Sequence, residues 1–171
     1  MKKRKAIITL IIFFALLAGM IYTAVYGLGS SKSGAASDIK LGLDLAKESG
    51  ADLMLATDPD ADRVGIAMKC PDGSYELVTG NEMGVLLLDY ICAGRKELGT
   101  LPEKAVAVKS IVSTPLADAV AAHYGVEMRS VLTGFKWIGD QIASLEAAGE
   151  VDRFIFGFEE SYGYLAGPYV R

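Results

Sequence analysis

Ala105-Val106-Ala107-Val108 begins the part of the chain that decides the fold. The sequence predicts a strand here, followed by a helix that Thr114 caps and that has Pro115 at its first position. Further strands are expected at 126–131 and 154–156, and a further helix at 136–148. Strands that alternate with helices are typical of a mostly parallel sheet. We therefore predict an α/β fold with a mixed, mostly parallel sheet that is flanked by helices.

Upstream of this region the sequence predicts a second group of elements. A helix ends at Gly50, because glycine is a common helix stop. The other expected elements are strands at 53–56, 64–68 and 75–78 and a helix at 81–93. Ligands of parallel sheets bind outside the carboxyl ends of strands. The loops that follow these strands are therefore where we look for chemistry.

Three carboxylates alternate in Asp58-Pro59-Asp60-Ala61-Asp62-Arg63, directly after an expected strand. Carboxylate oxygens suit Mg²⁺, and carboxylates this close repel each other unless a cation offsets them. An EF-hand calcium loop does not fit, because Arg63 stands where glycine is needed and Lys69 where glutamate is needed. The Arg63 guanidinium suits phosphate. Metal ligands beside an arginine predict phosphoryl chemistry, with an acidic surface turn as the alternative.

Two further loops carry candidate binding residues. Thr133-Gly134-Phe135-Lys136 places a lysine at a helix start, where backbone N–H groups favour anions and a lysine is unfavourable for the helix dipole. Phe158-Glu159-Glu160-Ser161-Tyr162-Gly163 offers carboxylates and a hydroxyl, which suit the hydroxyl groups of a sugar. The alternatives are a solvated surface lysine and a polar turn. His123, the only histidine, has no acid or nucleophile nearby in the sequence and is interpreted as structural.

Residues 6–28 contain no charged residue and follow the basic run 2–5. A helix of this length spans a bilayer, which favours a retained transmembrane helix over a cleaved signal peptide or a buried core helix. The positive-inside rule then predicts a single-pass membrane protein with a cytoplasmic N-terminus. Cys70 and Cys92 are interpreted as core thiols of a reducing compartment, with a disulfide as the alternative. The net charge of -4 gives no sign of a nucleic-acid partner.

Residues 45–171 resemble the α-D-phosphohexomutase superfamily, the phosphoglucomutases and phosphomannomutases. Residues 56–63 look like its metal-binding loop, residues 132–139 like a catalytic-lysine segment of its third domain, and residues 156–164 like its sugar-recognition loop. The resemblance implies an isomerase that moves a phosphoryl group within a hexose phosphate, glucose or mannose phosphate, by way of a phosphoserine. It also implies a cytoplasmic enzyme of carbohydrate metabolism.

The resemblance implies a role for each matching residue. Mg²⁺ is bound by Asp58, Asp60 and Asp62. Arg63 and Lys136 are catalytic, and they stabilise charge or move a proton. Substrate is bound by Thr133, Gly134, Glu159 and Ser161. The phosphoserine motif of the family's first domain and the phosphate loop of its fourth are not recognised in the sequence, so we expect an inactive fragment.

Residues 1–46 resemble the N-terminus of the protein-export translocase subunit SecD, through Asp38-Ile39-Lys40-Leu41-Gly42-Leu43-Asp44-Leu45-Ala46. The predicted division is therefore an N-terminus, transmembrane helix and linker at 1–37, the end of mutase domain 2 with the metal loop at 38–74, and an incomplete domain 3 at 75–171. The expected partners are a hexose phosphate and, through residues 6–28, a membrane. The alternatives to a mutase are a SecD-like export component and a non-functional hybrid of the two.

Overall fold

The computed structural model describes residues 32–169. The chain divides into two compact units between Leu77 and Val78. The membrane helix predicted at 6–28 lies outside the described residues. Within residues 32–169, no helix combines the length and the apolar character that crossing a membrane requires. The domain boundaries drawn from the sequence remain predictions.

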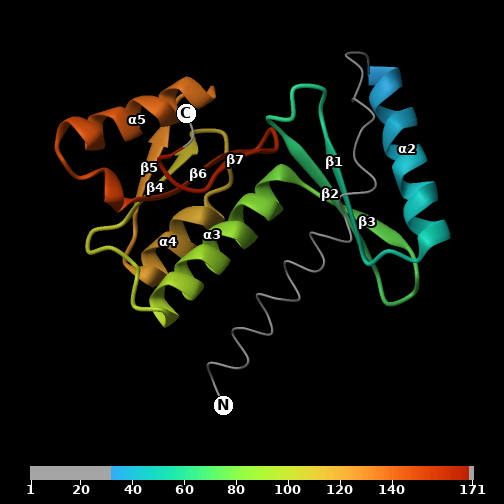
Figure 1. Ribbon diagram of the computed structural model, residues 1–171, viewed down its shortest axis with the longest axis horizontal. Coiled ribbons are helices and arrows are strands. Elements are labelled where there is room, and N and C mark those ends of the chain that lie inside the picture. Colours follow the sequence, from blue (N-terminus) through green and yellow to red (C-terminus); the bar gives the residue numbers. More distant parts are fainter. Residues whose placement is uncertain (1–31, 170–171) are drawn as a thin grey trace. The chain divides into compact units, whose positions relative to one another are not determined.

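The first unit is a helix beside a small sheet (Figure 1). Its elements are α2 (Lys32–Ser49), β1 (Leu53–Thr57), β2 (Val64–Lys69) and β3 (Tyr75–Val78). The strands lie in the order β1-β2-β3, and β1 pairs with β2 antiparallel. Ala46, Met54 and Ala67 form its buried core. The Tyr75 hydroxyl lies 2.9 Å from the carbonyl oxygen of Ala46, which ties the end of α2 to the sheet.

Two sequence predictions need correction in this unit. Residues 32–37 belong to α2, although their composition predicted a flexible linker. The strands form a sheet of their own in which β1 and β2 are antiparallel, although the sequence placed the acidic loop among those that follow strands of a parallel sheet. The reason is the short connection between β1 and β2, whose register pairs Thr57 with Val64. A loop this short joins antiparallel strands, whereas parallel strands need a longer crossover.

The second unit is the α/β layer structure that the sequence predicts. Its elements are α3 (Gly80–Glu97), β4 (Val106–Ser110), α4 (Leu116–Tyr124), β5 (Glu127–Val131), α5 (Phe135–Ala147), the short 3₁₀ helix η1 (Val151–Arg153), β6 (Phe154–Glu159) and β7 (Gly163–Leu165). The strands lie in the order β5-β4-β6-β7. β4 is parallel to both of its neighbours, and β7 is antiparallel to β6. The short strand β7 is absent from the sequence prediction.

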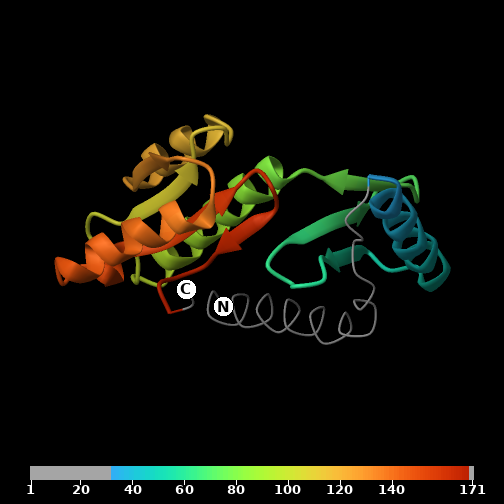
Figure 2. The ribbon, with the colours of Figure 1, turned by 90° about the horizontal axis from the view of Figure 1, so that it is seen from above.

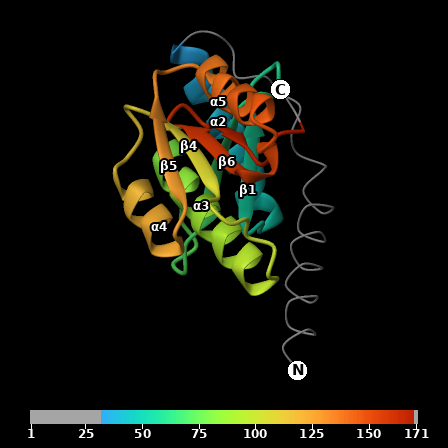
Figure 3. The ribbon, with the colours of Figure 1, turned by 90° about the vertical axis from the view of Figure 1, so that its left-hand side faces the viewer.

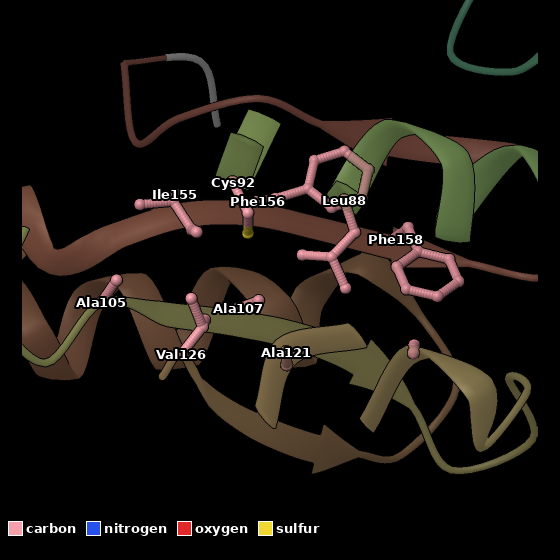
Figure 4. Close-up of a cluster of buried hydrophobic side chains, with 10 residues drawn as sticks. Leu88, Cys92, Ala105, Ala107, Ala121, Val126, Ile155, Phe156 and Phe158 are labelled. Carbon is pink, nitrogen blue, oxygen red and sulfur yellow. The ribbon is translucent and has the colours of Figure 1, made fainter. Parts of the chain in front are cut away.

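Helices cover both faces of this sheet, with α3 and α4 on one side and α5 on the other (Figure 3). On the α3 side, Leu88 and Cys92 pack with Phe156 and Phe158 of β6 (Figure 4). On the α5 side, a second buried cluster consists of Val106, Val108, Ile138, Ile142, Leu145 and Phe154. The two clusters fix the central strands, and so they fix the edge where these strands end.

The two cysteines are predicted to differ in reactivity. Both are free thiols, and Cys92 is fully buried whereas Cys70 is half-buried. Burial, followed by the charge of Asp89, raises the pKa of Cys92 to about 11. Because the thiolate is the reactive form, we expect one thiol of the native protein to react with Ellman's reagent at pH 8 and the second to react only after unfolding. Fast reaction of native Cys70→Ser would contradict this.

Candidate functional site

The acidic loop is the connection between β1 and β2 in the first unit (Figure 2). Asp58, Asp60 and Asp62 each offer a carboxylate oxygen, and these oxygens all lie within 4.8 Å of one another. Ala61 makes this possible, because its positive φ of 57° turns the chain so that the side chains on either side converge. The three metal-ligand candidates are therefore brought together in the described structure.

Arg63 lies against these carboxylates. Its backbone N–H donates to Oδ1 of Asp58 at 3.2 Å, and its Nε lies 3.7 Å from Oδ2 of Asp58 and 3.9 Å from Oδ1 of Asp62. The Arg63 side chain remains 58% exposed, and that of Asp58 16% exposed. More than half of the Arg63 side chain is thus exposed to solvent while its Nε faces the two acids.

The crowding of the carboxylates appears in their pKa values. Burial alone would raise the pKa of Asp58, but hydrogen bonds from the Arg63 N–H and from Asp62, together with the Arg63 charge, lower it overall. The hydrogen bond with Asp58, then burial and the charges of Asp58 and Asp60, raise the pKa of Asp62. The opposite shifts of these two neighbouring groups reflect the mutual repulsion of the carboxylates. This donor set fits Mg²⁺, which favours carboxylate oxygens and whose charge would offset that repulsion.

The second unit brings the other predicted residues to one edge of its sheet. The segment 133–136 follows β5 and the segment 159–161 ends β6, and both strands flank β4. Oε1 of the buried Glu159 accepts a hydrogen bond from the Gly134 N–H at 2.5 Å. The Ser161 hydroxyl lies 3.5 Å from the other oxygen of Glu159. Gly134 has a φ of 119°, a conformation that glycine adopts readily and other residues rarely do.

Lys136 lies exposed in the first turn of α5, as the sequence predicts. Its Nζ stands 4.8 Å from the centroid of the Trp137 ring, the only tryptophan of the chain. The N-cap residue of α5 is Gly134, which has no side chain to accept the N–H groups of the first turn. The helix start therefore combines an exposed cation with the positive end of the helix dipole, which is a favourable place for an anionic group.

The sequence reasoning missed a polar cluster at the end of β4. Lys109 is only 5% exposed, and its Nζ lies 3.0 Å from Oδ2 of Asp118 and 3.3 Å from the Ser113 carbonyl oxygen. Ser110 and Ser113 are also buried. The signal was a lysine and a serine directly after three apolar strand residues, because such a position at the carboxyl end of a central strand faces the site edge.

Comparison with known proteins gives consistent matches. Residues 79–171 match the family described as phosphoglucomutase/phosphomannomutase, alpha/beta/alpha domain III. A phosphoglucomutase of Staphylococcus epidermidis is 43% identical over 129 residues, which are 75% of this chain and 22% of that protein. The chain thus spans less than a quarter of this relative.

Solved structures share the fold. A crystal structure of a Thermus thermophilus protein assigned as a phosphomannomutase has a TM-score of 0.56 and 26% identity, over 78% of this chain and 27% of that chain. An Aspergillus fumigatus N-acetylphosphoglucosamine mutase, solved with GlcNAc-6P and magnesium, has a TM-score of 0.50 and 18% identity, over 72% and 26%.

Proposed function

Because this chain belongs to the phosphoglucomutase/phosphomannomutase family through its alpha/beta/alpha domain III, we propose that it serves phosphosugar mutase chemistry. The proposed reaction is the transfer of a phosphoryl group between positions of a hexose phosphate. The observation that carries the proposal is the meeting of Glu159, Gly134 and Ser161 at the sheet edge where α5 begins, with Lys136 in the first turn of that helix. Hydrogen-bonding groups for a sugar and a cation for its phosphate are thereby supplied by neighbouring loops.

In the first unit, we assign Asp58, Asp60 and Asp62 as ligands of Mg²⁺. The ion would supply Lewis-acid polarisation of a phosphoryl oxygen. Arg63 would bind phosphate oxygens through its exposed guanidinium edge, because its Nε is already directed toward Asp58 and Asp62. The Mg²⁺ and GlcNAc-6P of the Aspergillus enzyme are consistent with this assignment.

In the second unit, we assign Lys136 to the phosphate or to proton transfer, and Thr133, Gly134, Glu159 and Ser161 to the sugar. Glu159 is buried and fixed by the Gly134 N–H, so its second oxygen is oriented before substrate arrives. Lys109 adds a buried positive charge at the neighbouring strand end. The phosphoserine motif is not recognised in these residues, so we propose that this chain alone does not turn over.

The membrane-export alternative rests on residues 1–46, of which residues 1–31 lie outside the described structure. The SecD resemblance, the membrane attachment and the hybrid origin therefore remain predictions from the sequence. No contact of the described residues favours them over the mutase assignment.

Trp137 offers a direct test of sugar-phosphate binding. We expect glucose 1-phosphate or glucose 1,6-bisphosphate to change the fluorescence of the full chain, because an anion at the start of α5 draws the Lys136 ammonium away from the ring. Lys136→Gln should remove the response. Lys96→Gln is a matched control, since Lys96 lies 5.6 Å from the ring of Tyr124 at the far end of α3. An unresponsive wild-type chain, or an equal response from Lys136→Gln, would refute the assignment.

A further inference from the structure

Glu160, which follows the sugar-binding candidate Glu159, is held by two buried hydroxyls of another loop. Its Oε2 accepts a hydrogen bond from the Ser110 hydroxyl at 2.6 Å and one from the Ser113 hydroxyl at 3.3 Å. The two serine oxygens lie 2.8 Å apart. The contact joins the loop after β4 to the loop after β6, across about fifty residues of chain.

The number of hydroxyl protons limits how these three groups can hydrogen-bond. Each serine hydroxyl has one proton to donate, so there are two protons for three contacts. One contact joins the two hydroxyls, and the other two join each hydroxyl to Oε2 of Glu160. If Ser110 donates to Glu160, then the Ser113 proton goes either to Ser110 or to Glu160. Ser110 is 0% and Ser113 4% exposed, so water does not replace a lost partner without cost. The arrangement therefore favours one position of the Glu160 side chain.

The backbone of Glu160 is fixed from the opposite side. Helix α3 begins so close to it that a Cβ on Gly80 would lie 2.0 Å from the Glu160 carbonyl oxygen. The Asn81 side chain accepts the Thr114 N–H at 2.9 Å, which anchors the serine loop to the same helix start. Tyr162, two residues after Glu160, takes a positive φ of 71°, so the chain turns sharply soon after the fixed point. The loop between β6 and β7 is thus clamped on two sides.

We propose that Glu160 is a positioning residue for the sugar-recognition loop, an inference that rests on the proposed function. Adjacent side chains at a strand end point in opposite directions. Glu160 points to the serine loop, and Glu159 points to the start of α5, where it accepts the Gly134 N–H. Fixing Glu160 to Ser110 and Ser113 therefore sets the direction in which Glu159 presents its carboxylate.

The Gly134 amide proton is the readout. A short hydrogen bond to a carboxylate moves such a proton downfield in an NMR spectrum, and that shift disappears when the carboxylate moves away. We expect Glu160→Ala to shift the Gly134 proton upfield in the ligand-free full chain. Glu160→Gln should retain the wild-type position, because its amide oxygen still accepts from Ser110. A wild-type Gly134 shift in folded Glu160→Ala would overturn the proposal.

Two further variants separate positioning from general stability. Glu127→Ala removes a carboxylate that pairs with Arg129 and Arg153 at the opposite end of the sheet, so it should lower Tm without moving the Gly134 proton. If Glu160→Ala does not fold, Ser113→Ala replaces it, since it removes one of the two donors and keeps the carboxylate. A Gly134 proton at its wild-type position in Ser113→Ala would then count against the proposal. A Gly134 proton that moves upfield would support it.

Titration with glucose 1,6-bisphosphate separates this inference from the proposed function. We expect binding to be roughly tenfold weaker in Glu160→Ala and near wild type in Glu160→Gln, because misplaced groups lose much of their binding contribution. Absence of binding by the wild-type chain would remove the sugar assignment, whereas the Gly134 result in the ligand-free chain would still decide whether Glu160 positions the loop.

Discussion

Asp60→Asn is expected to abolish most of the stabilisation that Mg²⁺ gives to the first unit. The free energy of unfolding should rise by about 2.7 kcal/mol when free Mg²⁺ is roughly 100 times its Kd, because the ion binds the folded loop and not the unfolded chain. In the proposed site, three carboxylate oxygens within 4.8 Å of one another would supply that affinity. Removing one charged ligand should leave little of the effect. Urea unfolding with and without Mg²⁺, and with EDTA added, measures the difference.

Asp60 is the informative position because it is exposed, whereas Asp58 also accepts the Arg63 N–H and supports the loop itself. Asp52→Asn is the matched control, since Asp52 is an exposed acid of the same unit outside the cluster. It should respond to Mg²⁺ as wild type does. If wild type gains no stability from Mg²⁺, or if Asp60→Asn gains as much as wild type, the metal assignment is wrong.

The second large effect is expected at Gly80, where α3 begins. An added Cβ would lie 2.0 Å from the carbonyl oxygen of Glu160 and 3.0 Å from the backbone nitrogen of Tyr162. These are backbone atoms, so neither can rotate out of the way. We expect Gly80→Ala to destabilise the second unit by about 3 kcal/mol, at the upper end for overpacking. The urea midpoint of unfolding, followed by circular dichroism, measures this.

Gly94, on the same helix, provides the control. A Cβ there meets nothing within 4 Å. Gly94→Ala should therefore stabilise the helix by about 0.5–1 kcal/mol, since glycine in a helix interior costs that much relative to alanine. If the two substitutions change the free energy of unfolding in opposite directions, the close approach to Glu160, and not helix propensity, determines the effect at Gly80. Equal stabilisation by both substitutions would show that the helix start can move.

The sequence predicted the second unit well because its signals are local. The apolar strand residues and the alternation of strands with helices are patterns of residues close together in the chain, and β4, β5 and β6 were each predicted to within a few residues. The strand β7 was missed, because its three residues are too short to carry a period and it exists only by pairing with β6. The antiparallel pairing of β1 with β2 was missed, because the partner of a strand is decided by loop length and packing.

The candidate site could be predicted where several charged residues lie close together in the sequence. The convergence of Asp58, Asp60 and Asp62 followed from their spacing. The roles of Glu160 and Ser113 did not, because their partners lie far away in the sequence and only the fold brings them together. Lys109 was missed for a related reason. In the sequence, a lysine after an apolar run looks like the exposed end of a strand, and its contact with Asp118 appears only in the folded structure.

The order of the strands also has a consequence for how the chain reaches this structure. The β1–β2 hairpin closes through one short loop, so its contacts form early in folding. The central pairing of β4 with β6 joins segments separated by α4, β5 and α5. Such distant contacts are slow to form, because the intervening chain must lose its freedom before the strands can pair. The acidic loop between β1 and β2 should therefore be complete while the edge that carries Glu159 is still being assembled.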